Sequence, residues 1–337
     1  LDLDDGWHVD SVLHRPPKST GGFFSVGYCV TGPTGKQAYL KALDFSHTRQ
    51  APDPLRALQA MLNAYIFERD LLEKCKGRKL ARVVTPLAHG NVQVPGWVGD
   101  LSTVYYIVFE LARGDIRTEV ANWKQFDLAW ALRSLHHASI GLRQLHSVGI
   151  AHQDLKPSNV LVFPQEGAKI ADLGRSSSQD TPSDMDKCQI PGDVTYAAPE
   201  QLYGWRLSPD FCLRYVADLY QLGNLLFFYL TGISSTAAMR TKLVRAVPGF
   251  SGMDFIHDLP YLQQAFSEVV SDLRAILPPL EDKIASEIVM IAQQLCEPDP
   301  RRRGDSNAPL SGRPQHDLQA YISRFDRLAK RAEWMLK

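Results

Sequence analysis

The chain has 337 residues, of which 45% are hydrophobic and 22% are charged, and its 37 lysines and arginines balance 37 aspartates and glutamates. This composition is typical of a folded globular protein, and the length suits one large domain or two lobes around a cleft. A net charge of zero argues against bulk electrostatic binding to nucleic acid, so we expect no nucleic-acid partner.

The sequence carries no clear mark of export or membrane insertion. Its longest apolar run, residues 222–233, is interrupted by glycines and is too short to span a bilayer. Residues 1–6 are acidic and lack the basic and apolar pattern of a signal peptide. The five cysteines are scattered, odd in number and form no metal-ligand pair, as is typical of free thiols in a reducing compartment. We therefore expect a cytoplasmic protein with no membrane span in this chain.

The first hundred residues are predicted to be rich in β-strand. Residues 23–30 and 37–45 have the composition of strands and are separated by a turn that contains glycine and proline. Residues 54–74 are predicted to form a helix, because apolar side chains recur there at helical spacing. Glu68 lies on the same apolar stripe. A carboxylate on a buried face needs a partner, because an unpaired buried charge is very costly.

The character of the chain changes after one more apolar strand, predicted at residues 104–111. Helical patterns follow at residues 128–146, 217–230 and 283–295, and no internal repeat is seen. A small sheet followed by a larger helical part predicts an α+β fold class.

Three oxygen-bearing side chains lie near short apolar strands in the middle of the chain. Asp154 and Asn159 share a polar loop that leads into one strand, and Asp172 ends the next. At adjacent strand ends, a carboxylate and an amide can hold Mg²⁺ while the other carboxylate stays free, as phosphoryl transfer requires. Asp154 alone would be interpreted as a loop residue that caps a turn. Together with His152 and Lys156, the set is far more specific.

Over residues 19–303 the sequence resembles the eukaryotic-type (Hanks-type) serine/threonine protein kinases. The matching motifs are His152-Gln153-Asp154, Asp172-Leu173-Gly174, Ala198-Pro199-Glu200, Asp218 as the brace of the catalytic loop, and Arg303 as the partner of Glu200. The resemblance implies a bilobal protein-kinase-like fold, with a β-rich N-lobe at 1–112, a helical C-lobe at 113–305 and a helical extension at 306–337. It also implies phosphorylation of serine and threonine hydroxyls on protein substrates, including the chain itself.

The resemblance further implies roles for the polar loop residues. Asp154 would accept the proton of the substrate hydroxyl, and Lys156, typical of the serine/threonine type, would neutralise the γ-phosphate of ATP. Asn159 and Asp172 would hold Mg²⁺ or Mn²⁺.

Nucleotide contacts are implied mainly for the first third of the chain. Lys41 would hold the α- and β-phosphates, and its ion-pair partner would be Glu68, the carboxylate on the predicted buried stripe. Further nucleotide contacts are implied for Gly21, Gly22, Val26, Glu110, Ala112 and Asp115.

Three departures from the family pattern stand out. At residues 19–26 only Gly21 remains of the three phosphate-loop glycines, and Phe24 replaces another. Gln153 replaces the arginine that can capture a phosphate on the activation segment, and Asp193 replaces a threonine near the catalytic base. The first five candidate phosphate acceptors of that segment are Ser176, Ser177, Ser178, Thr181 and Ser183. Because the capturing arginine is missing, we predict that their modification is not required for activity.

Two alternatives stay open at this point. The altered glycine loop would suit a pseudokinase that binds but does not transfer, and the retained Lys41, Asp154 and Asp172 argue against it. A small-molecule kinase of the aminoglycoside-phosphotransferase kind shares the catalytic loop, and Lys156 and Arg303 argue against that class.

The end of the chain predicts a helix with a heptad-like apolar seam. The seam consists of Leu318, Ile322, Phe325, Ala329, Ala332 and Leu336. It is short for a stable coiled coil, so we favour packing on the helical lobe over self-association.

Overall fold

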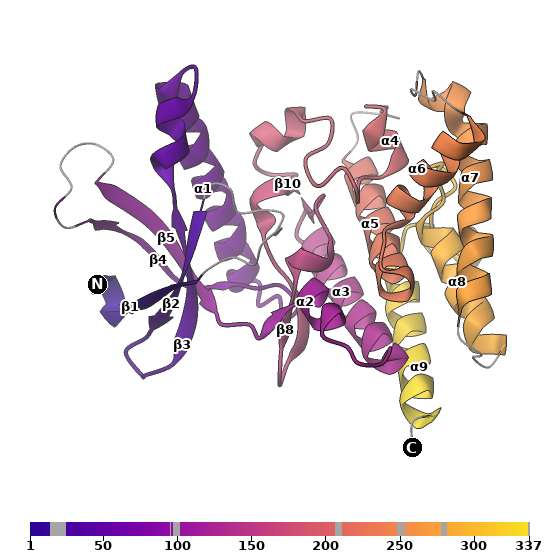
Figure 1. Ribbon diagram of the computed structural model, residues 1–337, viewed down its shortest axis with the longest axis horizontal. Coiled ribbons are helices and arrows are strands. Elements are labelled where there is room, and N and C mark those ends of the chain that lie inside the picture. Colours follow the sequence, from indigo (N-terminus) through magenta and orange to yellow (C-terminus); the bar gives the residue numbers. More distant parts are fainter. Residues whose placement is uncertain are drawn as a thin grey trace. The chain divides into compact units, whose positions relative to one another are not determined.

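Two units, one rich in strands and one in helices, make up the computed structural model (Figure 1). The structure describes residues 1–13, 25–94, 96, 102–205, 211–247, 252, 254–277 and 282–335. The first unit comprises Leu1–Arg113 and Asp172–Gly174, and the second comprises Gly114–Ala171 and Arg175–Lys337. The predicted α+β fold class, with a sheet-rich part before a helical one, is confirmed.

A five-stranded antiparallel sheet is the centre of the first unit as far as it is described, with strand order β1-β2-β3-β5-β4. The strands are β1 (His8–Leu13), β2 (Ser25–Thr31), β3 (Gln37–Leu43), β4 (Pro86–Gln93) and β5 (Thr103–Glu110). On β3, Ala38, Leu40 and Ala42 point into an apolar cluster that includes Val108 of β5. Because side chains along a strand alternate between its faces, Lys41 lies on the opposite face.

The helix α1 (Pro54–Gly77) supplies the other component of this unit. It begins where the side chain of Asp53 accepts a hydrogen bond from the backbone nitrogen of Arg56 at 3.1 Å, a typical N-cap. Its buried residues include Tyr65, Glu68 and Leu72. The hydroxyl of Tyr65 donates to the backbone oxygen of Tyr106 on β5, so α1 is fixed to the sheet three residues before Glu68.

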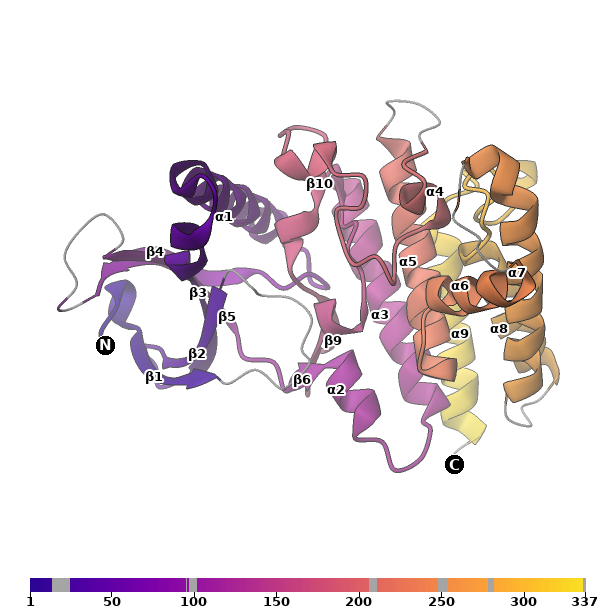
Figure 2. The same cartoon turned by 45° about the horizontal axis from the view of Figure 1, so that its top comes forward.

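The second unit is built around helices (Figures 1 and 2). They are α2 (Ile116–Ala121), α3 (Leu128–Ser147), α4 (Pro199–Leu202), α5 (Cys212–Thr231), α6 (Ser235–Ala246), α7 (Phe255–Ile276), α8 (Asp282–Leu295) and α9 (Leu318–Met335). Every residue of α5 from Val216 to Tyr229 is buried. A helix that is buried all round lies at the centre of its unit, and α3, α6 and α8 pack around this one.

The second unit also contains short strands, which lie outside its helices. They are β6 (Gly114–Asp115), β7 (Ile150–Ala151), β8 (Val160–Phe163), β9 (Gly167–Ile170) and β10 (Ser177–Ser178). The 3-10 turns are η1 (Asp4–Gly6), η2 (Phe45–Gln50), η3 (Pro157–Asn159), η4 (Leu173–Arg175), η5 (Asp184–Lys187) and η6 (Pro309–Ser311). The polar loop predicted from the sequence runs from β7 to β8, and β8 pairs with β9, which leads into Asp172.

The C-terminal helix α9 packs along α3 of its own unit, as the yellow ribbon beside α3 shows in Figures 1 and 2. Phe325 and Ala329 of the predicted seam are fully buried, whereas Leu336 lies outside the described residues. Arg133 of α3 adds ion pairs to Asp326 at 2.7 Å and to Glu333 at 2.8 Å. The seam is therefore used within the chain, as the favoured alternative predicts.

Among the helices of the described ranges, none taken singly is long and apolar enough to cross a membrane. Only α5 and α6 together pass that test, by length and composition, and the pair is bent by 79°.

Candidate active site

In the first unit, Lys41 of β3 meets two carboxylates. Its Nζ lies 2.8 Å from Oε1 and 2.9 Å from Oε2 of Glu68, and 3.3 Å from Oδ1 of Asp172. The sequence predicted a partner for Glu68 from its place on the buried stripe of α1, and the structure supplies Lys41. The alternation of β3 explains the meeting, because it turns Lys41 away from the apolar cluster and toward α1.

The electrostatics of this triad keep the lysine charged. Burial alone would lower the pKa of Lys41, but Asp172 and Glu68 together raise it above its ordinary value. The amine therefore remains a cation throughout the neutral range. A fixed cation on a strand can bind phosphate oxygens.

Asp172 has a less ordinary backbone. Its φ is 63°, in the left-handed region that non-glycine residues seldom adopt, although aspartate tolerates it better than most. Its side chain is 43% exposed, so the carboxylate has room for a ligand in addition to Lys41. Local strain of this kind clusters at functional sites, where it aims a side chain.

In the second unit, the loop from β7 to β8 surrounds Asp154 with polar groups. Oδ2 of Asp154 lies 3.0 Å from Nζ of Lys156 and accepts from Nδ2 of Asn159 at 3.2 Å. Oδ1 accepts from the backbone nitrogen of Asp193 at 2.8 Å. Burial raises the pKa of Asp154 above its ordinary value, although Lys156 works against the shift. A raised pKa suits a general base, because the carboxylate then holds a proton more readily.

Asp193, the departure from the family threonine, lies beside the same lysine. Its Oδ2 is 3.7 Å from Nζ of Lys156, and its Oδ1 accepts from the hydroxyl of Thr195 at 2.7 Å. Burial works against ionisation, but the bonds from Thr195 and the charge of Lys156 hold the pKa of Asp193 below its ordinary value. Lys156 is thus flanked by two carboxylates.

Side chains of the central helix α5 hold this loop in place by hydrogen bonds to its backbone. Asp218 accepts from the backbone nitrogens of His152 at 2.8 Å and of Gln153 at 2.7 Å, as the resemblance implied. Gln221, one turn further on, donates to the backbone oxygen of Gln153 and accepts from the backbone nitrogen of Leu155, both at 2.8 Å. Sequence reasoning missed Gln221, although a lone glutamine within an apolar helix is a usable signal.

A second missed residue is Gly192, which precedes Asp193. A Cβ at this position would lie 2.6 Å from Oδ1 of Asp154 and 2.6 Å from the backbone oxygen of Gln153. Only glycine allows the chain to approach the catalytic loop this closely.

The Glu200–Arg303 pair implied by the resemblance is present. Nη1 of Arg303 lies 2.6 Å from Oε1 of Glu200, and Nη2 lies 2.8 Å from Oε2. Arg303 has no exposed surface, and its Cζ lies over the ring of Tyr220, 4.8 Å from the ring centroid. The pair anchors the end of the segment that begins after Asp172 to the loop that follows α8.

The remaining predicted nucleotide contacts are scattered over several elements. Gly21 and Gly22 lie outside the described residues. Val26 lies on β2 opposite Ala42. Glu110 ends β5 and Ala112 follows it. Asp115 caps α2, because its Oδ1 accepts from the backbone nitrogen of Thr118 at 2.7 Å. This hydrogen bond occupies one carboxylate oxygen of Asp115, the residue predicted to contact the ribose.

The two predicted metal ligands belong to different units, and each offers oxygen. Asp172 presents an exposed carboxylate, and the amide nitrogen of Asn159 is occupied by Asp154, so its oxygen is the end that can bind a cation. Within the described ranges, no three acidic, histidine or cysteine side chains cluster as a complete ligand set. Mg²⁺ fits this chemistry, because it is commonly held by one or two carboxylates together with substrate phosphates and water.

Comparison with known proteins agrees with this geometry. Residues 20–308 match the family model described as protein kinase domain. The chain is 36% identical to the serine/threonine-protein kinase SBK1 of Danio rerio over 30% of the chain and 26% of that protein. It is 26% identical to the probable serine/threonine-protein kinase PknB of Lactococcus lactis over 71% of the chain and 37% of that protein. It is 31% identical to the serine/threonine-protein kinase PknA of Mycobacterium tuberculosis over 35% of the chain and 26% of that protein.

The chain belongs to the protein kinase domain family. The relatives that it matches carry the names of serine/threonine protein kinases, and the chain spans well under half the length of each of these three. Neither alternative raised by the sequence is supported by these comparisons.

Proposed function

We propose that this chain transfers the γ-phosphate of ATP to serine and threonine hydroxyls of protein substrates, including its own. The observation that carries the proposal is the surroundings of Asp154. Its carboxylate is buried, has a raised pKa and is fixed by Lys156, Asn159 and the backbone of Asp193. A carboxylate held in this way is prepared to accept a proton from an incoming hydroxyl.

In the proposed reaction the hydroxyl oxygen of the substrate bonds to the γ-phosphorus as the bond to the bridging oxygen of ADP breaks. Asp154 accepts the hydroxyl proton, and Lys156 neutralises charge on the transferred phosphoryl group. Lys41, held by Glu68, binds the α- and β-phosphates. Mg²⁺ or Mn²⁺, held by Asn159 and Asp172, would supply further neutralisation of phosphate charge.

The adenosine contacts complete the proposal. We assign the phosphate loop to Gly21 and Gly22, the cover of adenine to Val26, and the backbone contacts to adenine to Glu110 and Ala112. Asp115 keeps one oxygen for the ribose hydroxyls while the other caps α2. We assign residues 1–112 to the N-lobe, 113–305 to the C-lobe and 306–337 to the helical extension.

The test is transfer of labelled γ-phosphate to a generic protein substrate and to the chain itself, in the presence of Mg²⁺ or Mn²⁺. Asp154→Asn is the matched control, since it preserves shape and removes the base. Transfer to serine or threonine that disappears in Asp154→Asn supports the proposal. Nucleotide binding with no transfer above that control would replace it with the pseudokinase alternative.

A further inference from the structure

The segment that follows Asp172 is tied to the catalytic loop by a strand pair and by side-chain hydrogen bonds. Ser177 and Ser178 form β10, which pairs with Ala151 and Ile150 of β7. Ser176 and Ser177 have no exposed surface, and Ser178 is 6% exposed. Three of the five candidate acceptors are therefore structural in this conformation, because a kinase cannot reach a buried hydroxyl.

A chain of hydrogen bonds leads from the catalytic loop through this strand. The side-chain nitrogen of Gln153 donates to the hydroxyl of Ser177. That hydroxyl donates in turn to Oδ1 of Asp186 at 2.7 Å, so Ser177 links the amide to the carboxylate. Gln153 directly precedes Asp154, and its φ of 60° is in the left-handed region. The bonds of Gln153 therefore help to fix the backbone that carries Asp154.

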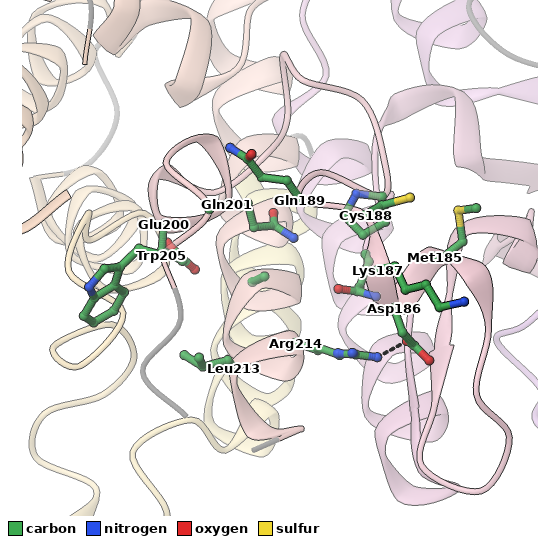
Figure 3. Close-up of a pocket in the computed structure, with 14 residues that line it drawn as sticks. Met185, Asp186, Lys187, Cys188, Gln189, Glu200, Gln201, Trp205, Leu213 and Arg214 are labelled. Carbon is green, nitrogen blue, oxygen red and sulfur yellow. Dashed lines mark hydrogen bonds and ion pairs between the residues drawn. The ribbon is translucent and has the colours of Figure 1, made fainter. Parts of the chain in front are cut away.

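The chain of bonds ends in a charge pair. Asp186 of η5 forms an ion pair with Arg214 in the first turn of α5. Oδ2 of Asp186 also accepts a hydrogen bond from the backbone nitrogen of Ser183 at 2.8 Å. The side chains of Asp186 and Arg214 are 20% and 27% exposed, so water screens the pair only partly. Figure 3 shows the two side chains facing one another from the segment and from α5.

The pair also lines a cavity of about 330 Å³ between the segment and α5. Gln153 contributes to the same wall, together with Met185 and Cys188 of the segment and Leu213 of α5. At this wall of the cavity the Asp186–Arg214 pair is a direct charged contact between η5 and α5.

We infer that Asp186 and Arg214 are positioning residues that hold the segment in place and, through Ser177 and Gln153, orient the loop of Asp154. Asp186 supplies the negative charge that a phosphate would otherwise bring, and Arg214 supplies the positive charge that Gln153 lacks. The inference rests on the proposed function for its kinetic effect, and it agrees with the prediction that modification of the five candidate acceptors is not required for activity.

The chain offers a matched control in the same 3-10 turn. Asp184 pairs with Lys187 at 3.2 Å, but their side chains are 62% and 81% exposed, and exposed pairs contribute little. Asp186→Asn and Asp184→Asn are thus the same chemical change two residues apart. Arg214→Gln and Arg214→Lys form a second comparison, in which lysine keeps the charge.

The first readout is steady-state transfer to a peptide, with thermal unfolding measured on each variant. We expect Asp186→Asn and Arg214→Gln to lower kcat by about tenfold, which is about 1.4 kcal/mol. KM for ATP should stay within about twofold, since Lys41 and Glu68 are untouched. Asp184→Asn should match the wild type, and Arg214→Lys should recover part of the loss.

The second readout is limited trypsin digestion, scored by cleavage after Lys187, which lies in η5. Arg214→Gln should be cut several-fold faster than Arg214→Lys if the pair holds the segment, and this comparison leaves the residues around the cleaved bond unchanged. Equal cleavage and equal kcat in all variants would overturn the inference. If the wild type transfers no phosphate, the proposed function fails, and the digestion still decides whether the pair holds the segment. If Asp186→Asn does not fold, the comparison of Arg214→Gln with Arg214→Lys decides in its place.

Discussion

Replacing Lys41 with methionine would leave the carboxylate of Glu68 buried without the amine that lies 2.8 Å away. The side chain of Glu68 is 9% exposed and that of Lys41 is 22% exposed. Breaking a fully buried ion pair costs about 3–5 kcal/mol, and partial exposure lowers the expected loss of unfolding free energy to about 2–3 kcal/mol. Phosphate transfer should fall by about a hundredfold or more, which is about 3 kcal/mol of barrier.

A second substitution separates stability from catalysis. Glu68→Gln keeps the shape and removes the charge, so adding it to Lys41→Met should recover more than half of the lost stability. It should not recover transfer, because the phosphate-binding cation is still missing. Stability is measured by urea unfolding without nucleotide, so that ligand binding does not contribute to the free energy.

The pH dependence of the stability of Lys41→Met tests the same argument from the burial of Glu68. Burial raises the pKa of Glu68 above its unfolded value, so the folded state of Lys41→Met binds a proton more tightly than the unfolded state does. Its stability deficit relative to the wild type should shrink as pH falls from 7 toward 5. If the deficit grows on acidification, or if the double variant is no more stable than Lys41→Met, the argument from burial is wrong.

Three further predictions concern other parts of the chain. Gly192→Ala should lower kcat by at least about tenfold, because its Cβ would displace Asp154, while thermal unfolding changes by only a few degrees. Transfer should lose its base as pH falls through the raised pKa of Asp154, so the acid limb of kcat should lie above the ordinary aspartate value of about 3.9. Lys156→Gln should move this limb to still higher pH, and an unmoved limb would contradict the assignment. A chain ending at Asp305 should lose stability in urea with no change of oligomeric mass by light scattering, because α9 packs on α3. A halved mass would instead show self-association through α9.

Physical rules applied to single elements predicted much of the first unit. A carboxylate on an apolar helical stripe demands a partner, and β-type composition predicted three of the five described strands of the sheet. These rules need only the local sequence. The pairing itself came from the family resemblance, since nothing in the spacing of residues 41 and 68 connects them.

The support of the catalytic loop was only partly predictable. Asp218 followed from the resemblance, and Gln221 carried a local signal that was not used, but Gly192 and the Asp186–Arg214 pair did not follow from any local pattern. Each depends on two distant segments meeting at a few ångströms. Helices α6 and α7 were also not predicted, and Pro260 near the start of α7 is one reason, because proline usually ends a helical pattern.

The pairing of Glu200 with Arg303 has a consequence for the order in which the protein is made. The two residues are 103 positions apart, and both are buried. At about 5–20 residues per second, the ribosome adds Arg303 about 5–20 s after Glu200. Until then the carboxylate of Glu200 has no guanidinium partner. It must stay hydrated, because burying an unpaired charge is very costly. The segment that Glu200 anchors therefore docks only after Arg303 has been synthesised.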